Sequence, residues 1–410
     1  MVGLVTLTSY DVHTVRKHYP ALSDGWAYLD GAAGTQVPEA VIDAIARAGR
    51  GGIANHGGVF AASRRSDGFV DAARAAMADL VGGIDARGVV LGPNTTTLVF
   101  RLAQAMSDTW RPGDDVVVSR LDHDANVRPW VRWAERAGVT VRWVDPRTPS
   151  TDLEAEAYDG VVGPRTRVVA VTAASNLTGS IPDVAAIADR AHAVGATVVV
   201  DGVHATPHLP VDMVALGADV WLTSAYKWSG PHVGALVADP AFLEPLRPDK
   251  LAPAPDEIPW RFETGTPPFA DLAGVSAAVD HLAGLAGSPD TAGSRRERIV
   301  ASMSAVAAYE LDLFSRLHDG LAAMDHVEII GSPTRRTATE YFRIRGRHPT
   351  AVAEHCARAH VNVWAGHMYA WELTGLLGVR DTGGGVRAGL VHYNDENDVD
   401  RLLDALDDLR

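Results

Sequence analysis

ATVVVDG at residues 196–202 and DVWLTSAYK at residues 219–227 are the two stretches that decide the fold. Each is a short run of apolar and β-branched residues that ends in polar side chains, which is typical of a buried strand in a parallel sheet. Similar runs occur at 89–91, 115–119, 139–144, 167–173 and 234–239, and they alternate with helical stretches. This alternation predicts an α/β fold with a mainly parallel, seven-stranded sheet that helices cover on both faces.

The rest of the chain predicts a second, smaller domain, because 410 residues exceed what one ordinary hydrophobic core needs. A long helical pattern at 294–324 leads into expected strands near 326–330, 339–344 and 385–393 and expected helices at 349–360 and 395–409. We therefore expect a large domain at 26–275. The linking helix would belong to a small α/β domain formed by 1–25 and 276–410.

The charge and composition argue against several classes of protein. A net charge of -14 argues against a nucleic-acid binder, because such proteins need a basic surface to displace counterions. The opening residues lack the pattern of a signal peptide, and no apolar run is long enough to span a membrane. The single cysteine, Cys356, cannot form an internal disulfide. We expect a cytoplasmic protein without a metal site.

Lys227 is unusual among the three lysines of the chain. Lys17 and Lys250 lie in charged or proline-rich segments, whereas Lys227 follows an apolar strand. A desolvated lysine tends to lose its proton and become a nucleophile. The alternative is a lysine at a strand end whose ammonium group reaches the solvent.

Asp201 directly follows an apolar run, at the edge of the sheet where ligands of such folds bind. A carboxylate there can pair with a protonated pyridine nitrogen, and the next strand brings Lys227 to the same edge. The two residues together predict an enzyme that holds pyridoxal 5′-phosphate (PLP) as a Schiff base on Lys227.

Further residues fit this cofactor, although each allows another interpretation. Thr95 and Thr96 lie where a helix begins, a place suited to a phosphate, but Asn94 or Thr95 could serve only as a helix cap. His123 could stack on the cofactor ring or move protons, or be a solvated loop residue. Arg387, a charge inside an apolar strand, could bind a substrate carboxylate or form an internal ion pair.

Seven segments in order resemble the class V aminotransferase family of fold type I PLP enzymes, and most closely its cysteine desulfurase and selenocysteine lyase branch. The segments are YLDGAAGTQVP (28–38), DHDANVRPW (122–130), SNLTGSIPD (175–183), VDGVHATPH (200–208), SAYKWSGPHVG (224–234), RFETGTP (261–267) and VRAGLVHYN (386–394). Several motifs in a fixed order are far more specific than any one of them.

The resemblance implies a role for individual residues. Lys227 would carry the cofactor, Asp201 would face the pyridine nitrogen, His123 would stack on the ring, and Asn176 would lie near the ring oxygen. Thr95, Thr96, Ser224 and, from a partner subunit, Thr266 would bind the phosphate, and Arg387 would hold the substrate carboxylate. A threonine from the partner implies a homodimer with shared active sites.

Three positions depart from the desulfurase pattern. The family places a persulfide-forming cysteine in a segment such as GHHCA, whereas this chain reads GHMYA at 366–370, with Tyr369 at that position. The glutamine expected after Asp201 is His204, and the histidine expected before the lysine is Tyr226. Cys356 lies in a helical segment, and we expect it to be a small core residue.

These observations favour a lyase that breaks the C–S bond of a cysteine derivative by β-elimination without an enzyme persulfide. Tyr369, Tyr226 or His367 could give a proton to the leaving group. An epimerase or an aminotransferase would use the same carbanion, and the family contains both. A non-catalytic scaffold is the alternative from another class, although it would not need Lys227, Asp201 and Arg387 together.

Overall fold

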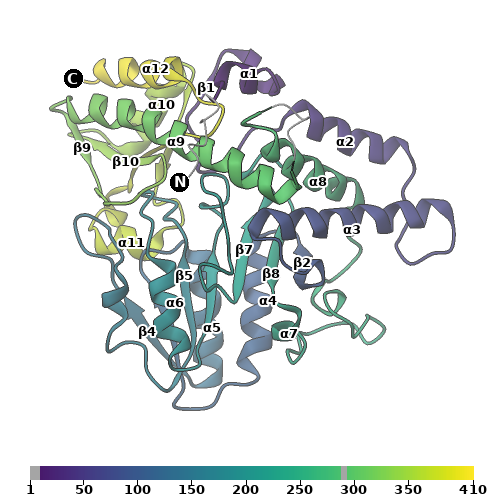
Figure 1. Ribbon diagram of the computed structural model, residues 1–410. Coiled ribbons are helices and arrows are strands. Elements are labelled where there is room, and N and C mark those ends of the chain that lie inside the picture. The colour runs from purple at the N-terminus through teal and green to yellow at the C-terminus, as the bar shows by residue number, and fades with distance from the viewer. Residues whose placement is uncertain (1–9, 288–292) are drawn as a thin grey trace, which may run out of the picture.

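The computed structural model describes residues 10–287 and 293–410, and a seven-stranded sheet lies at its centre (Figure 1). The strand order is β2-β8-β7-β6-β5-β3-β4. β8 runs opposite to the other six strands, so the predicted mainly parallel sheet is confirmed. The strands are β2 (Val89–Gly92), β3 (Asp115–Ser119), β4 (Thr140–Val144), β5 (Thr166–Thr172), β6 (Thr197–Asp201), β7 (Val220–Ser224) and β8 (Gly234–Ala238).

Both faces of this sheet are buried, as the continuous apolar runs predict. Successive side chains along β3 alternate between the two faces: Val116 and Val118 belong to one hydrophobic cluster and Val117 to the other. The cluster around Val116 contains α4 (Thr95–Ser107) and α5 (Arg128–Ala137). The opposite cluster contains residues of α2 (Glu39–Arg50), α3 (Ala61–Val81), α6 (Val184–His192) and α8 (Phe269–Ala283).

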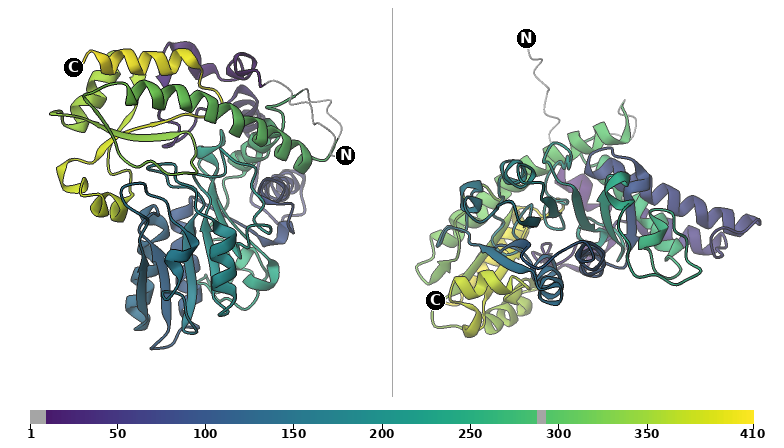
Figure 2. Two further views of the ribbon diagram at one scale, coloured as in Figure 1. Left: turned by 60° about the vertical axis from the view of Figure 1, so that its left-hand side comes forward. Right: turned by 90° about the horizontal axis from the view of Figure 1, so that it is seen from below.

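The C-terminal part forms an α/β layer with a hydrophobic cluster of its own, at the upper left of Figure 1. Its antiparallel sheet has the order β12-β13-β10-β9. A capping box between Ser294 and Glu297 begins the long helix that leads into it. That helix and the last one lie side by side (Figure 2, left). The elements are α9 (Arg295–Ala322), β9 (Val327–Ile329), β10 (Thr339–Ile344), α10 (Pro349–Arg358), β12 (Trp364–Gly366), β13 (Gly385–Gly389) and α12 (Glu396–Asp407).

β13, the last strand of this layer along the chain, is shorter than its sequence predicts. β13 ends at Gly389 instead of continuing to residue 393. There the segment around Asp30 pairs with it in parallel: the Gly389 N–H donates to Leu29 O at 2.8 Å, and Asp30 forms a β-bridge to Gly389. A Cβ on Gly389 would lie 2.6 Å from the Cβ of Ala32, so glycine permits this close approach.

The sequence did not predict three short strands. β12 is three residues long, and β1 (Ala27–Tyr28) pairs in parallel with β11 (Val361–Asn362). Alternation over two or three residues is too brief to mark a strand. The expected boundary between 275 and 276 falls inside α8, and the division into domains stays a prediction.

Within the described ranges, no helix combines the length and apolar character needed to cross a membrane. The remaining elements are short and connect the layers. They are α1 (Val12–Arg16), α7 (Pro240–Leu243), α11 (Trp371–Leu376) and the 3₁₀ helices η1 (Pro20–Asp24), η2 (Ala86–Gly88), η3 (Asp124–Asn126), η4 (Ala155–Tyr158), η5 (Ala225–Lys227), η6 (Trp260–Phe262) and η7 (Arg380–Thr382).

Candidate active site

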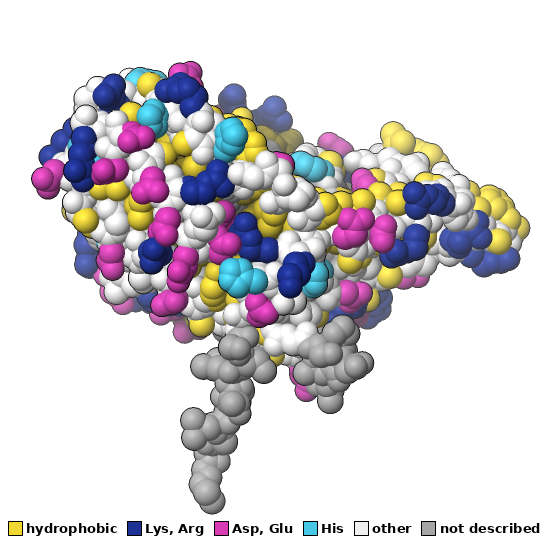
Figure 3. All heavy atoms as spheres, turned by 90° about the horizontal axis from the view of Figure 1, so that it is seen from above, with side chains coloured by type: hydrophobic (Ala, Val, Ile, Leu, Met, Phe, Trp, Pro, Cys, Tyr) yellow, Lys and Arg dark blue, Asp and Glu magenta, His cyan; other side chains and the backbone are white. Residues whose placement is uncertain are grey.

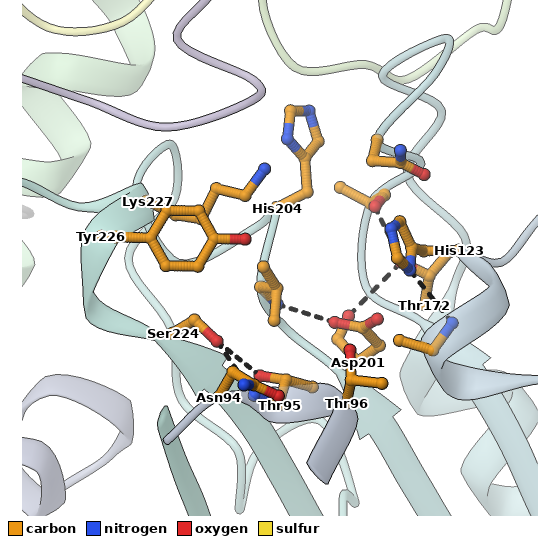
Figure 4. Close-up of a pocket in the computed structure, with 14 residues that line it drawn as sticks. Asn94, Thr95, Thr96, His123, Thr172, Asp201, His204, Ser224, Tyr226 and Lys227 are labelled. Atoms are coloured by element: carbon orange, nitrogen blue, oxygen red, sulfur yellow. Dashed lines mark hydrogen bonds between the residues drawn. The ribbon is translucent and has the colours of Figure 1, made fainter. Parts of the chain in front are cut away.

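The parallel strands of the large sheet end at one edge, and a pocket lies there (Figure 4). Thr172, Asp201 and Ser224 are the last residues of β5, β6 and β7. Ligands of open α/β sheets bind at this edge because the polar loops after the strands converge on it. The pocket is lined by Asn94, Thr95, Thr96, His123, Ala125, Thr172, Ala174, Asn176, Asp201, Val203, His204, Ser224, Tyr226 and Lys227.

Lys227 reaches the pocket from η5, the turn that directly follows β7. Its side chain is buried, so the alternative of an ammonium group in solvent is wrong. Its Nζ donates a hydrogen bond to the backbone oxygen of Ala32. Burial, together with the positive charge of Arg387, lowers the pKa of Lys227 to about 7. An amine with this pKa is partly unprotonated near neutral pH and can act as a nucleophile.

Asp201 lies in the same pocket, fully within the protein. One of its oxygens accepts a hydrogen bond from the Val203 N–H at 2.9 Å. Burial raises the pKa of Asp201 to about 6, while the nearby Lys227 works in the opposite direction. The carboxyl group therefore stays mostly ionised at neutral pH and can balance a buried positive charge.

Thr95 and Ser224 meet where α4 begins. Their hydroxyl oxygens lie 2.8 Å apart, and the Thr95 N–H also donates to Ser224 Oγ at 3.1 Å. Asn94 caps the helix by accepting from the Thr97 N–H, and phosphate binding by Thr95 and Thr96 stays a prediction. A Cβ on Gly234 would lie 2.6 Å from the backbone of Asn94, so this glycine lets the helix start reach the sheet.

His123 lies on the side of the pocket opposite Lys227 (Figure 4), and Asn176 also lines the pocket. His123 is half-buried rather than fully solvated, and its Nδ1 accepts from the Ala125 N–H at 3.0 Å. Burial lowers the pKa of His123 to about 3, so the ring is neutral and carries its proton on Nε2. Asn176 donates to Met368 O at 2.7 Å, and its buried Oδ1 has no partner among the described residues.

His204 lies next to Lys227 at the edge of the pocket (Figure 4). Its Nε2 lies 3.0 Å from Thr337 Oγ1 and 3.1 Å from Thr339 Oγ1, which belong to the C-terminal layer. Its buried Nδ1 has no partner within the described part of the chain. Burial holds the pKa of His204 well below its ordinary value, so the imidazole is neutral.

Arg387 reaches the site from β13 and is buried. Its guanidinium donates to Asn176 O at 2.7 Å, and its Nε has no partner in the described chain. Burial lowers the pKa of Arg387 to about 10. Among the described residues, no carboxylate forms an ion pair with Arg387, so the alternative of an internal ion pair is wrong. The guanidinium keeps donors available for an anionic ligand.

An outer cleft of about 990 Å³ continues from the pocket toward the surface. One wall is the loop 366–370, where both Met368 and Tyr369 have positive φ angles, a conformation that side chains disfavour. The loop is held by Asn176 and by the Asp124 N–H, which donates to Tyr369 O at 2.8 Å. Tyr369 is 67% exposed, and its ring stacks on His123 with centroids 5.4 Å apart.

Two residues of interest lie away from Lys227 within the chain. Thr266 lines a different pocket, together with Asn55, His56 and Trp260. Cys356 is buried in the hydrophobic cluster of the C-terminal layer, which confirms the expectation of a core residue. Burial raises the pKa of its thiol to about 11, so it is a poor nucleophile at neutral pH.

The sequence analysis missed several groups near the pocket. Thr172 pairs directly with Asp201 in the sheet, and its position at a strand end could have revealed it. Asp122, next to His123, is buried, and burial raises its pKa to about 8. Asp30 is half-buried, and the positive charges of Arg387 and Lys227 act on its carboxyl group. Lys227 donates to a backbone oxygen of Ala32, and a contact to the backbone leaves no pattern in the residue types.

The pocket fits PLP by the chemistry of its groups. It offers hydroxyls and backbone N–H groups at a helix start, a buried carboxylate, a lysine with a lowered pKa and buried polar atoms of Asn176 and His204 that lack partners. Buried polar groups are nearly always hydrogen-bonded, so such unpaired atoms indicate a ligand site. The described residues contain no group of three or more metal-ligating side chains.

Comparisons with known proteins agree with this geometry. Residues 27–402 match the family model of the class-V aminotransferases. An uncharacterized protein of Mycobacterium tuberculosis is 36% identical over 97% of this chain and 99% of its own length. A cysteine desulfurase of Klebsiella pneumoniae is 31% identical over 98% and 99% of the two chains.

The fold is also similar to that of solved structures. The crystal structure of a cysteine desulfurase from Escherichia coli superposes with a TM-score of 0.85 at 28% identity, covering 97% of this chain and 98% of that one. A match over most of the chain, in sequence and in fold, is specific to a family. The chain therefore belongs to the class V aminotransferase family and is a PLP-dependent enzyme.

Proposed function

We propose that this enzyme breaks the carbon–sulfur bond of a cysteine derivative by β-elimination, without a persulfide on the protein. A cysteine S-conjugate and water would give pyruvate, ammonium and the free thiol, with no change in overall oxidation state. The observation that carries the proposal is the loop 366–370, where Tyr369 rather than a thiol faces the outer cleft. The only cysteine, Cys356, is buried in another part of the fold.

The cofactor is held at several points in this proposal. Thr95, Thr96 and Ser224 would bind the phosphate at the start of α4, and Lys227 would hold the cofactor covalently. Asp201 would pair with the pyridine nitrogen, and the cofactor would supply the electron sink that makes the α-proton of an amino acid acidic. His123, Asn176, His204 and Tyr226 would contact the ring and its polar groups.

Arg387 orients the substrate, and Lys227 removes its α-proton. Arg387 has free donors and no internal ion pair in the described chain, which suits a bidentate contact with the α-carboxylate. The Lys227 amine, with a pKa lowered to about 7, removes the α-proton as a base. It can pass a proton to the β-carbon after the sulfur group has left, which forms the methyl group of pyruvate.

Tyr369 is our candidate for the group that protonates the departing sulfur. The loop 366–370 places its ring against His123, and Tyr369 lines the outer cleft. Tyr226 and His367 line the same cleft and are the other candidates. A proton supplied at the sulfur atom turns a poor leaving group into a neutral thiol.

A homodimer completes the site in this proposal, with Thr266 of one subunit reaching the phosphate of the other. Two features support the dimer. Thr266 lies in a pocket apart from Lys227 within the chain. The loop between α2 and α3, at the right of Figure 1, exposes Val59 and Phe60, whose exposed fractions are 87% and 55%. Figure 3 shows hydrophobic side chains at the right-hand end of the molecule. Exposed apolar side chains of this size mark interfaces.

The test is to mix the PLP-loaded enzyme with cysteine S-conjugates and to measure pyruvate and free thiol. Equal amounts of both products would support elimination. Recovery of the amino acid with its α-deuterium exchanged would point to an epimerase, and ketoacid that retains the sulfur would point to an aminotransferase. If the protein takes up no PLP, it is a scaffold. Tyr369→Phe keeps the ring that stacks on His123 and should slow elimination by about tenfold or more.

A further inference from the structure

We propose that the substrate carries a large, uncharged aromatic or apolar group on its sulfur atom, and that Trp364 and Phe100 select for it. This inference rests on the proposed function, because it names the substrate class of the same site. Three observations carry it: the size of the outer cleft, the position of Trp364 beside Arg387, and the pairing of charges along the cleft.

Within one subunit, the outer cleft is larger than cysteine itself needs. Its volume of about 990 Å³ is at the upper end of the range for pockets that hold drug-sized ligands, roughly 300–1,000 Å³. It shares His123, Asn176 and Lys227 with the inner pocket, so the two form one continuous space. A substrate that reacts at Lys227 and fills this space must extend well beyond its β-carbon.

Trp364 stands where the side chain of such a substrate would pass. In the antiparallel pair of β12 and β13, Trp364 is the direct partner of Arg387. Direct partners point to the same face of a sheet, with Cβ atoms about 4.5–5.5 Å apart. A carboxylate held by Arg387 therefore brings the rest of the substrate next to the Trp364 ring.

The ring of Trp364 is free to receive a ligand. It is 51% exposed, and among the described residues it has no stacking contact with an aromatic ring or a cation. Phe100 of α4 lines the same cleft and is 40% exposed. Trp371, in contrast, lies outside the cleft lining and is stacked under Arg380 at 4.4 Å. The cleft thus presents open aromatic surface, which favours an apolar or aromatic group.

The charges along the cleft exclude a second charged group on the substrate. Four charged residues line it, and Arg128 is paired with Asp124 at 2.9 Å and with Glu372 at 2.8 Å. Lys227 and Arg387 remain, and the proposed reaction uses both for the amine and the carboxylate. A charged sulfur substituent would find no unpaired charge of opposite sign among the remaining lining residues, so an uncharged group suits the cleft better.

The experiment compares ligands that cannot undergo elimination. Propylglycine and phenylpropylglycine replace the sulfur atom of S-methylcysteine and S-benzylcysteine by a methylene group. Each is titrated into the PLP-loaded enzyme, and the change in the visible spectrum gives the dissociation constant. We expect phenylpropylglycine to bind at least roughly tenfold more tightly than propylglycine. Equal affinity for the two ligands would overturn the inference.

Substitutions test which side chains cause the preference for the larger ligand. Trp364→Ala and Phe100→Ala should each remove most of the preference, while Trp371→Ala, an exposed tryptophan in the neighbouring helix, should keep it. A preference that survives both cleft substitutions would also overturn the inference. Because these ligands do not eliminate, the result is independent of the reaction. A retained preference together with no pyruvate from S-benzylcysteine would reject the elimination but support this binding site.

Discussion

The hydroxyl oxygens of Thr95 and Ser224 lie 2.8 Å apart, although 129 residues separate the two in the chain. One begins α4 and the other ends β7, and Gly234 in β8 leaves the space that lets the two elements meet. Two hydroxyls and the first N–H group of a helix therefore meet at one point of the pocket. Such a helix start suits a phosphate, and the proposed site rests on this arrangement.

Ser224→Ala should weaken PLP binding by roughly tenfold or more, because a hydrogen bond to a charged group contributes about 1.5–3 kcal/mol. Equilibrium dialysis of the cofactor-free protein with PLP measures the affinity. Ser107→Ala is a matched control at the other end of α4, where the hydroxyl only donates to Gln104 O. Equal affinity of the Ser224 variant and the wild type would place the phosphate elsewhere.

The rate at which the cofactor-free protein binds PLP covalently should rise with pH around a midpoint near 7. The reason is that burial and Arg387 lower the pKa of Lys227 to about 7, from an ordinary value of 10.5, and only the unprotonated amine reacts. Arg387→Met removes a positive charge that disfavours the protonated amine, so the midpoint should move to higher pH. Stopped-flow absorption measures the rate.

Arg132→Met, which changes an exposed arginine of α5, serves as the control for that experiment and should leave the midpoint in place. A midpoint near 10 in the wild type would contradict the lowered pKa. So would an Arg387 variant that titrates like the wild type.

Cys356→Ala should retain the elimination activity within about twofold. Its thiol is buried in the C-terminal layer, and its pKa is raised to about 11, so it cannot serve as a sulfur acceptor. The variant should lose about 1–2 kcal/mol of stability through the small cavity that it leaves. Pyruvate formation and thermal unfolding are the two measurements. A folded variant without activity would show that the persulfide-free route is wrong.

Mixed dimers test the shared site. Lys227→Ala and Thr266→Ala alone should each be impaired, since each lacks one group in both sites. When the two variants are refolded or expressed together, a mixed dimer has one site with both groups intact, and activity should rise above that of either variant. No gain on mixing, with mixed dimers demonstrated by mass spectrometry, would mean that Thr266 does not act across the interface.

Much of the fold followed from the sequence because buried parallel strands leave a strong local signal. The runs around 196–202 and 219–227 predicted both the sheet and the meeting of Asp201 with Lys227. β12 and the pair of β1 with β11 left no such signal, because pairing between distant segments determines strands of two or three residues. The same long-range contacts ended β13 at Gly389.

The residues of the candidate site also fall into those that the sequence could reveal and those that it could not. Side chains at strand ends, such as Asp201 and Ser224, could be found from the pattern, and Thr172 could have been found by the same argument. The contact of Lys227 with the backbone of Ala32, and the position of Trp364 beside Arg387, depend on tertiary packing. Neither follows from the residue types alone.

The central claim is that Lys227 carries the cofactor, and reduction of the PLP-loaded enzyme with borohydride tests it most directly. Borohydride fixes an imine as a stable amine, and mass spectrometry of the digested protein then locates the modified residue. The prediction is a pyridoxyl phosphate group on Lys227 and none after Lys227→Ala. Modification of Lys17 or Lys250 instead, or no modification of a PLP-treated wild type, would contradict it.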